Sequence, residues 1–283
     1  MTSTSTVKEY LIESYYPQKE PFYIDVLGET QVFEAAFLER IPVMLKGPTG
    51  CGKSRFVEYM TYKIGKKINC QMPLITVPCH EDLNADDLKG RHLMDGSYQE
   101  GPALLAVKHG GILYLDEIVE ARNDTTVVIH PLADHRKNLV VEKLGKVFEA
   151  LDTFMLVISY NPGYQRKIKD LKQSTKQRFV AIHMDYPPSE IEQRIIMHEA
   201  QVEESVAACL TEIGHKVRNL KGHGLDEGAS TRLLINYAKL IRKGIDPIRA
   251  CEIAIMNPIT DDLDVYKELR EGLADVVSNY FPK

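Results

Sequence analysis

From residue 42 to residue 184 the chain alternates between short apolar runs and segments with helical periodicity. Five runs stand out: Pro42–Leu45, Met72–Val77, Ile112–Leu115, Thr153–Ser159 and Phe179–Met184. Each run predicts a strand, and the four consecutive apolar residues Ile112–Leu115 predict one that is buried on both faces, as in a parallel sheet covered by helices. Apolar residues at positions 56, 57, 60 and 64, followed by Gly65, predict a helix directly after the first strand. The pattern therefore predicts an α/β fold with a five-stranded parallel sheet.

Between these strands the pattern predicts further elements. A short helix is expected over Gln31–Arg40, and a helix over Val119–His130 that ends at Pro131. The glycine-rich segment 90–101 suits a surface loop or hairpin. Two short strands, Asn138–Val141 and Lys146–Phe148, flank Glu142–Gly145 and predict a β-hairpin.

After Tyr186-Pro-Pro188 the periodicity is helical to the end. One stripe has apolar residues at positions 206, 210, 213, 217 and 220, and Ser189 with Glu192 predicts a capping box at the start of the first helix. We place the domain boundary at the two prolines. Residues 1–20 are expected to form an N-terminal arm, residues 21–187 the α/β domain, and residues 188–283 an all-helical lid domain.

The stretch GPTGCGKS lies between the first predicted strand and its helix. It matches the pattern G-x-x-x-x-G-K-[ST] at every fixed position. Its glycines let backbone N–H groups turn inward on phosphates, and the helix N-terminus adds its positive dipole end. Lys53 would reach the β- and γ-phosphates of ATP, and the Ser54 hydroxyl would bind Mg²⁺. We expect the whole stretch to bind the nucleotide: Gly47, Pro48, Thr49, Gly50, Cys51, Gly52, Lys53 and Ser54.

Polar residues follow the third and fourth predicted strands, at the edge where α/β sheets bind their ligands. Asp116 and Glu117 come directly after Ile112–Leu115, and Asn161 follows Thr153–Ser159. Beside a P-loop, Asp116 would hold the Mg²⁺ that Ser54 also contacts. Glu117 would polarise the attacking water as a general base, and the Asn161 amide would reach the γ-phosphate or that water.

Two other functions remain open on these residues alone. A P-loop kinase would pass the phosphate to a small molecule and would need an acceptor pocket, for which the sequence offers no pattern. A nucleotide-gated binding module would scarcely hydrolyse ATP and would not need the Glu117 carboxylate. Hydrolysis in the absence of any acceptor distinguishes an ATPase from the kinase.

Composition bears on whether the protein binds nucleic acid, spans a membrane or is secreted. Acidic residues outnumber basic ones, 40 against 35, and the net charge of −5 argues against bulk nucleic-acid binding. No apolar run approaches the roughly 18 residues of a membrane span, and the polar start Met1–Thr6 is no signal peptide, so we expect a cytoplasmic protein. The five cysteines form no C-x-x-C pair and are expected to be reduced thiols. No second Cys/His pair accompanies Cys79–Asp82, so we expect no metal site there.

Six stretches carry a resemblance to a known family. They are Leu45–Ser54, Pro78–Asp82, Tyr114–Arg122, Ile158–Gln165, Ser174–Phe179 and Gly228–Arg232. In this order they resemble the P-loop, acidic strand end, asparagine-tipped strand, loop arginine and helical lid of an AAA+ ATPase. More narrowly, they resemble the MoxR group and its CbbQ/NorQ/GvpN branch, over most of residues 20–260.

The resemblance implies roles at matching positions. Residues 47–54 correspond to Walker A, Asp116 with Glu117 to Walker B, and Asn161 to sensor 1. Arg178 matches the arginine finger, which serves the neighbouring subunit's site, and Arg232 matches sensor 2. The resemblance also implies a homo-hexameric ring, in which residues 90–101 are the insert of the second helix and residues 138–148 the pre-sensor hairpin.

Members of this branch work with a partner that carries a von Willebrand factor A domain (a CbbO-like adaptor). Their targets are rubisco blocked by a sugar phosphate, nitric oxide reductase awaiting its iron, or the gas vesicle. The likeness is greatest to the rubisco-activating members, which implies rubisco as the target, in the cytosol or at the carboxysome. One departure is the insert, where relatives often have a tryptophan before a Gly-Pro and this chain has Ser97–Pro102 and no tryptophan anywhere.

Overall fold

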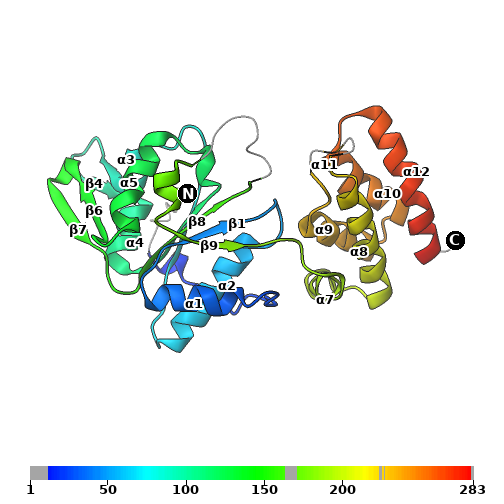
Figure 1. Cartoon of the computed structure of the whole chain (residues 1–283), viewed down its shortest axis with the longest axis horizontal. Helices are drawn as coiled ribbons and strands as arrows, with labels where there is room; N and C mark the ends of the chain where they lie inside the picture. Colours follow the sequence, from blue (N-terminus) through cyan, green and yellow to red (C-terminus); the bar gives the residue numbers. More distant parts are fainter. Residues whose placement is uncertain (1–11, 163–170, 223–224, 226, 282–283) are drawn as a thin grey trace, which may run out of the picture. The chain divides into compact units, whose positions relative to one another are not determined.

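The computed structural model describes residues 12–162, 171–222, 225 and 227–281 (Figure 1). Part of the expected N-terminal arm, residues 1–11, and the last three residues of the motif Ile158–Gln165 lie outside this range. Contacts divide the chain into two units: residues 1–47 with 53–183, and residues 48–52 with 184–283. No described helix combines the length and apolar character needed to cross a lipid bilayer.

The first unit is built on a parallel sheet of five strands in the order β2-β5-β8-β1-β9. The strands are β1 (Val43–Lys46), β2 (Leu74–Pro78), β5 (Gly111–Asp116), β8 (Phe154–Tyr160) and β9 (Val180–His183). The predicted α/β fold with a five-stranded parallel sheet is confirmed. All seven residues of β8 are buried, as expected of a central strand covered on both faces.

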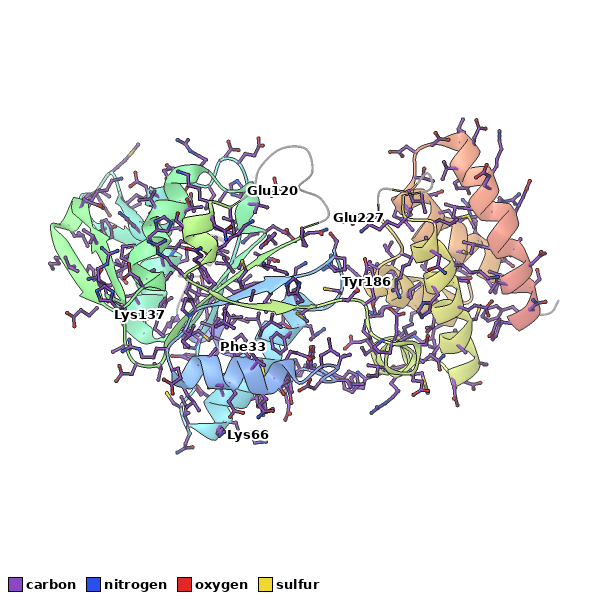
Figure 2. All side chains as sticks on the ribbon, in the orientation of Figure 1. Phe33, Lys66, Glu120, Lys137, Tyr186 and Glu227 are labelled. Carbon is purple, nitrogen blue, oxygen red and sulfur yellow. The ribbon has the colours of Figure 1, made fainter. Side chains whose placement is uncertain are left out.

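Helices cover both faces of the sheet, and the period of two along each strand assigns alternate side chains to each face (Figure 1). On one face, Leu113 and Leu156 share a core with Leu104. On the other, Phe33 (labelled in Figure 2) meets Phe56 edge-on with ring centroids 5.3 Å apart. The helices of this unit are α1 (Glu29–Leu38), α2 (Lys53–Lys67), α3 (Ala85–Lys89), α4 (Pro102–His109), α5 (Asn123–Ala133) and α6 (Gln173–Lys176).

The predicted helix over residues 119–130 is wrong at both ends. Residues Ile118–Glu120 form a 3₁₀ turn, and α5 begins only at Asn123. It then runs through Pro131 to Ala133. Pro131 lies in the last turn, so its missing N–H and its ring disturb only the end of the helix, which stops two residues later.

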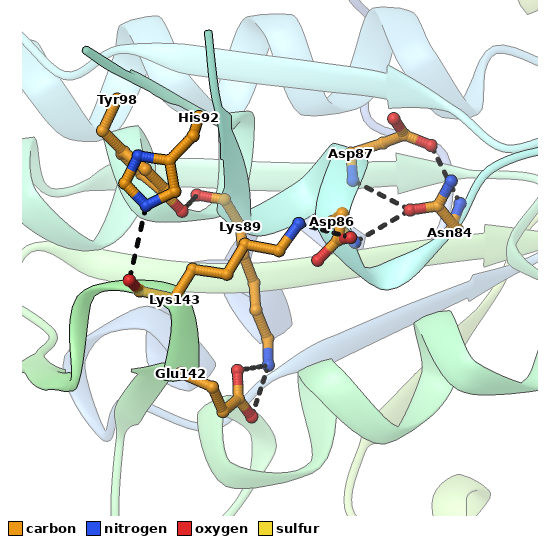
Figure 3. Close-up of polar contacts among 8 residues, drawn as sticks. All are labelled: Asn84, Asp86, Asp87, Lys89, His92, Tyr98, Glu142 and Lys143. Carbon is orange, nitrogen blue, oxygen red and sulfur yellow. Dashed lines mark hydrogen bonds and ion pairs between the residues drawn. The ribbon is translucent and has the colours of Figure 1, made fainter. Parts of the chain in front are cut away.

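Two antiparallel hairpins extend the first unit, and ion pairs and hydrogen bonds connect this part of the chain (Figure 3). One pairs β3 (Gly90–His92) with β4 (Tyr98–Glu100), and the other pairs β6 (Asn138–Val141) with β7 (Lys146–Glu149). The predicted hairpin over residues 138–148 is thereby confirmed, and segment 90–101 forms a hairpin.

The contacts come from charged side chains of α3, which leads directly into β3, and of the turn between β6 and β7. Lys89 Nζ lies 2.7 Å from a carboxylate oxygen of Glu142, and Lys143 Nζ lies 2.6 Å from Asp86 Oδ2 (Figure 3). Asp86 is fixed in turn, because Asn84 caps α3 by accepting from the backbone N–H of Asp86. Each of these pairs has at least one exposed partner and contributes little alone, but together they hold α3 and the β3–β4 hairpin that follows it against the β6–β7 hairpin.

The second unit is helical beyond residue 188, as predicted. Its helices are α7 (Ser189–Ala200), α8 (Glu204–Asn219), α9 (Thr231–Arg242), α10 (Pro247–Cys251), the π-turn Glu252–Met256, α11 (Asn257–Ile259) and α12 (Leu263–Tyr280). Leu210, Ile213 and Val217 of the predicted stripe lie fully buried in its core. Ser230 caps α9 by accepting from the N–H of Leu233 at 3.3 Å.

The predicted capping box of Ser189 and Glu192 is wrong. The N-cap of α7 is Pro188, so Ser189 is already the first helical residue, and its hydroxyl bonds to His215. Glu192 is fully buried and bonds to Arg218 of α8. A buried guanidinium offers a carboxylate a stronger partner than an exposed backbone N–H, which is why the tertiary contact forms in place of the local one.

Candidate nucleotide-binding site

The glycine-rich stretch forms the loop between β1 and α2. Gly50 and Gly52 have φ values of 70° and 106°, in the left-handed region that glycine adopts without steric cost. Helix α2 begins at Lys53, whose side chain is 6% exposed and whose ammonium donates to the Gly47 carbonyl at 2.8 Å. A buried lysine at a helix N-terminus after such a loop is arranged to receive an anion.

The structure brings Ser54 of α2 together with Asp116 at the end of β5. The Ser54 hydroxyl donates to Asp116 Oδ2 at 3.3 Å. A hydroxyl and a carboxylate are the hard oxygen ligands that Mg²⁺ takes, and at this distance both oxygens are within reach of one cation. The two residues therefore fit the expected magnesium site.

The other carboxylate oxygen of Asp116 is held by two buried hydroxyls. Tyr114 Oη donates to Asp116 Oδ1 at 2.7 Å, and Ser159 Oγ donates to the same oxygen at 2.5 Å. Both residues are fully buried. Burial raises the pKa of Tyr114 well above its ordinary value, so its hydroxyl remains a donor at neutral pH.

Strand geometry explains why these two hydroxyls meet Asp116. Tyr114 precedes Asp116 by two positions on β5, and residues two apart on a strand point to the same face. The register of β5 against β8 pairs Leu115 with Ile158. The next residues along the two parallel strands, Asp116 and Ser159, are therefore neighbours.

Glu117 follows in an unusual backbone conformation, with φ 55° and ψ 51°. Non-glycine residues rarely adopt this left-handed conformation, which is concentrated at functional sites. Its N–H donates to Ser159 Oγ at 3.1 Å, and its carboxylate lies 3.7 Å from Lys53 Nζ. Burial raises the pKa of Glu117, while the charge of Lys53 opposes this rise and the charge of Asp116 adds to it. The carboxylate is thereby brought nearer to the pKa of an effective general base.

Asn161 lies beside Glu117, just beyond the end of β8. It is 5% exposed, and its backbone N–H donates to the Glu117 carboxylate. The structure therefore assembles five of the residues expected from sequence, namely Lys53, Ser54, Asp116, Glu117 and Asn161.

Arg178 is not joined to this group. It lies just after α6, and its guanidinium donates to the Ser174 carbonyl of the same segment. Within the described residues, no hydrogen bond or ion pair connects it with Asp116 or Glu117. Its charge acts instead on His130, whose pKa is lowered by burial first and by Arg178 second.

Arg232 lies in the first turn of α9 in the second unit, two residues after the N-cap Ser230, and its side chain is exposed. Its association with the residues of the first unit stays a prediction.

The sequence reasoning missed Tyr114 and Ser159. A signal was present for both, because each is a hydroxyl residue within an otherwise apolar run. What the sequence lacked was the register, which decides whether a hydroxyl faces a carboxylate or the core.

Two family models match the chain. A model for the AAA domain of the dynein-related subfamily matches residues 42–179, and a CbbQ/NirQ/NorQ C-terminal model matches residues 192–279.

Curated relatives match nearly the whole chain. Protein CbbQ of Hydrogenophilus thermoluteolus is 56% identical, covering 92% of this chain and 96% of that protein. Denitrification regulatory protein NirQ of Stutzerimonas stutzeri is 48% identical, covering 92% of each. Protein NorQ of Paracoccus denitrificans is 48% identical, covering 90% of this chain and 94% of that protein.

Among solved structures, a mutant of RuvB from Thermotoga maritima is similar with a TM-score of 0.52 at 14% identity, covering 87% of this chain and 69% of that chain. Likeness at this level of identity bears on the fold alone.

Proposed function

The chain belongs to the CbbQ/NirQ/NorQ family of AAA-domain proteins, and we propose on that basis that it hydrolyses Mg·ATP to remodel a protein target. Residues 47–54 would hold the phosphates, and Ser54 with Asp116 would hold Mg²⁺. The cation would neutralise charge that develops on the transferred phosphoryl group. Glu117 would take the proton of the attacking water, and Asn161 would help to place that water.

The observation that carries this proposal is the convergence of α2, β5 and β8 on one point. Ser54 and Asp116 are 3.3 Å apart, and Glu117 lies 3.7 Å from the buried Lys53 with Asn161 beside it. A phosphate ligand, a cation ligand pair and a candidate base thus occupy the same strand edge. This is the set of groups that phosphoryl transfer to water requires.

The position of Arg178 is consistent with an enzyme that is active only as an oligomer. Its guanidinium donates to the Ser174 carbonyl of α6, and among the described residues no hydrogen bond or ion pair joins it to Asp116 or Glu117 of its own chain. We propose that it reaches the γ-phosphate of a neighbouring subunit in a homo-hexamer. Arg232, exposed at the start of α9, would contact the nucleotide of its own subunit.

For the target we propose rubisco, from which the ATPase would release inhibitory sugar phosphates with an adaptor that carries a von Willebrand factor A domain. The 56% identity to a CbbQ protein supports this choice. A NorQ-like role in activating nitric oxide reductase is the alternative, since NirQ and NorQ proteins are 48% identical. A GvpN-like role in gas-vesicle assembly is a further alternative.

Two variants test the chemistry. Glu117→Gln should retain ATP binding and lose turnover, because the amide cannot accept a proton. Lys53→Ala should lose binding, because its ammonium meets phosphate charge that is already present in the ground state. Phosphate release without any added acceptor is the assay, and a Glu117→Gln protein that turns over at the parent rate would refute the assignment.

The target is tested separately. The chain and the adaptor encoded in the same host should restore activity to rubisco blocked by a sugar phosphate, and Glu117→Gln should not. Restoration of nitric oxide reductase, with no effect on rubisco, would favour the alternative.

A further inference from the structure

Two hydroxyl groups hold the Asp116 carboxylate, one from its own strand β5 and one from the neighbouring strand β8. Oδ1 accepts from Tyr114 at 2.7 Å and from Ser159 at 2.5 Å, while Oδ2 faces Ser54 at 3.3 Å. The two carboxylate oxygens are thus divided between a supporting side and a side that faces the phosphate-binding helix.

Both hydroxyls belong to fully buried side chains. Their burial indicates that the hydrogen bonds to Asp116 have a role, because water is not available as an alternative partner. A tyrosine whose ring is excluded from water needs a partner for its hydroxyl, and phenylalanine would fill the same space without that need. The Tyr114 hydroxyl meets its need at the one carboxylate that the proposed mechanism assigns to Mg²⁺.

We propose that Tyr114 and Ser159 are positioning residues that fix the Asp116 carboxylate so that Oδ2 is presented to Mg²⁺. The proposal rests on the function proposed above. Groups that hydrogen-bond a metal-ligating carboxylate fix its orientation, and their loss typically costs about 10- to 100-fold in metal affinity.

Ser159 makes a second hydrogen bond, to the backbone of Glu117, which Tyr114 does not make. Its oxygen donates to Asp116 and accepts from the N–H of Glu117 at 3.1 Å. One hydroxyl therefore links the proposed magnesium ligand to the backbone of the proposed base, whose left-handed conformation requires support. The two residues should differ in effect: Tyr114 acts on the cation alone, and Ser159 acts on the cation and on the base.

The first test measures the affinity for Mg²⁺ separately from the rate of ATP hydrolysis. Binding of a fluorescent ADP analogue is followed while MgCl₂ is titrated, and again in EDTA. In Tyr114→Phe and Ser159→Ala the half-saturating Mg²⁺ concentration should rise about 10-fold or more. Affinity for the analogue in EDTA should stay near that of the parent, because the contacts of the two hydroxyls are with the Asp116 carboxylate, the Glu117 N–H and the Ser54 hydroxyl, the groups proposed to act on the cation and the water.

Turnover adds a second measurement. At saturating Mg²⁺, Tyr114→Phe should recover the parent kcat, since its only loss is in metal affinity. Ser159→Ala should remain slow even then, because the Glu117 backbone has lost its acceptor. This split between the two variants is not expected from a general loss of packing.

A matched control is available in the helical unit. Tyr237 is also fully buried and gives its hydroxyl to the Pro247 carbonyl at 2.9 Å. Tyr237→Phe removes one buried hydroxyl in the same way and should leave the Mg²⁺ requirement unchanged. If it shifts the requirement as much as Tyr114→Phe does, or if affinity in EDTA falls equally, the effect is structural and the proposal is overturned.

Asp116→Asn separates this proposal from the proposed function. If Asp116→Asn raises the Mg²⁺ requirement while Tyr114→Phe and Ser159→Ala match the parent, the positioning role is wrong and the magnesium site stands. If Asp116→Asn leaves the requirement unchanged, the assignment of Asp116 to Mg²⁺ fails, and the positioning role fails with it.

Discussion

Replacing Arg218 by methionine should destabilise the helical unit far more than an ordinary surface substitution. The Arg218 guanidinium donates to both carboxylate oxygens of Glu192, at 2.7 and 2.8 Å, and through Nε to the Ala229 carbonyl at 2.7 Å. Its Cζ also lies 4.0 Å from the centroid of the Tyr186 ring. The pair is removed from water, with the arginine side chain 11% exposed and that of the glutamate 0%.

The magnitude follows from what methionine leaves behind. Glu192 would keep one donor, the Thr231 hydroxyl at 2.5 Å, and would lose the charge that compensates its own. Breaking a buried ion pair from one side costs about 3–5 kcal/mol, because the remaining charge is still buried. Methionine retains the apolar stem of arginine, so little of this cost is lost packing.

Hydrogen exchange of the backbone amides in α7 and α9 is the appropriate measurement, because two units need not unfold together. Protection there should fall by on the order of a hundredfold or more, at about 1.4 kcal/mol per tenfold. Lys216→Met is the control, on the same helix. Its pair with Glu212 is 3.5 Å long with side chains 49% and 43% exposed, and such a pair is worth about 0.5 kcal/mol or less.

A double variant tests the cause. Glu192→Leu added to Arg218→Met removes the stranded charge, so the double variant should be more stable than the sum of the single effects by about 0.5–3 kcal/mol. The reasoning is refuted if Arg218→Met differs from the parent by no more than Lys216→Met does. It is also refuted if the two substitutions are additive.

Three further outcomes are expected. Arg178→Ala should bind ATP nearly as well as the parent yet lose roughly 10³-fold in turnover, and mixing it with Lys53→Ala subunits should restore part of the ATPase rate. If the mixed subunits form hexamers but show no ATPase activity, Arg178 does not act on the nucleotide of a neighbouring subunit. Because burial raises the pKa of Glu117 in the ligand-free site, kcat/KM should decline as the pH falls through a value above that of a free glutamate, since protonation removes the base. A pH profile with its acidic limb at the free value would contradict this. Cys70 is exposed and the other four cysteines are buried, so a thiol reagent should label the native protein once, and labelling of several thiols by mass spectrometry would contradict the burial.

The sequence alone determined the parallel α/β sheet, the loop before α2 and the acidic end of β5. Each depends on residues that are adjacent in the chain: a run of apolar residues, glycines at fixed spacing, or a carboxylate at the end of a run. Because parallel strands end at a common edge, this local information was enough to bring Ser54, Asp116 and Asn161 toward one place. It was also enough for the helical periodicity beyond Pro188.

Only the tertiary structure decided which polar groups meet inside the protein. Ser159 reaches Asp116 across 43 positions of sequence because of the register of β5 against β8. Glu192 pairs with Arg218 across 26 positions, in place of the local capping box that its spacing from Ser189 predicts. A local pattern states which hydrogen bonds a residue is able to make. In the water-excluded core an unpaired charge costs more than a cap gains, so packing between distant segments selects the bond that forms.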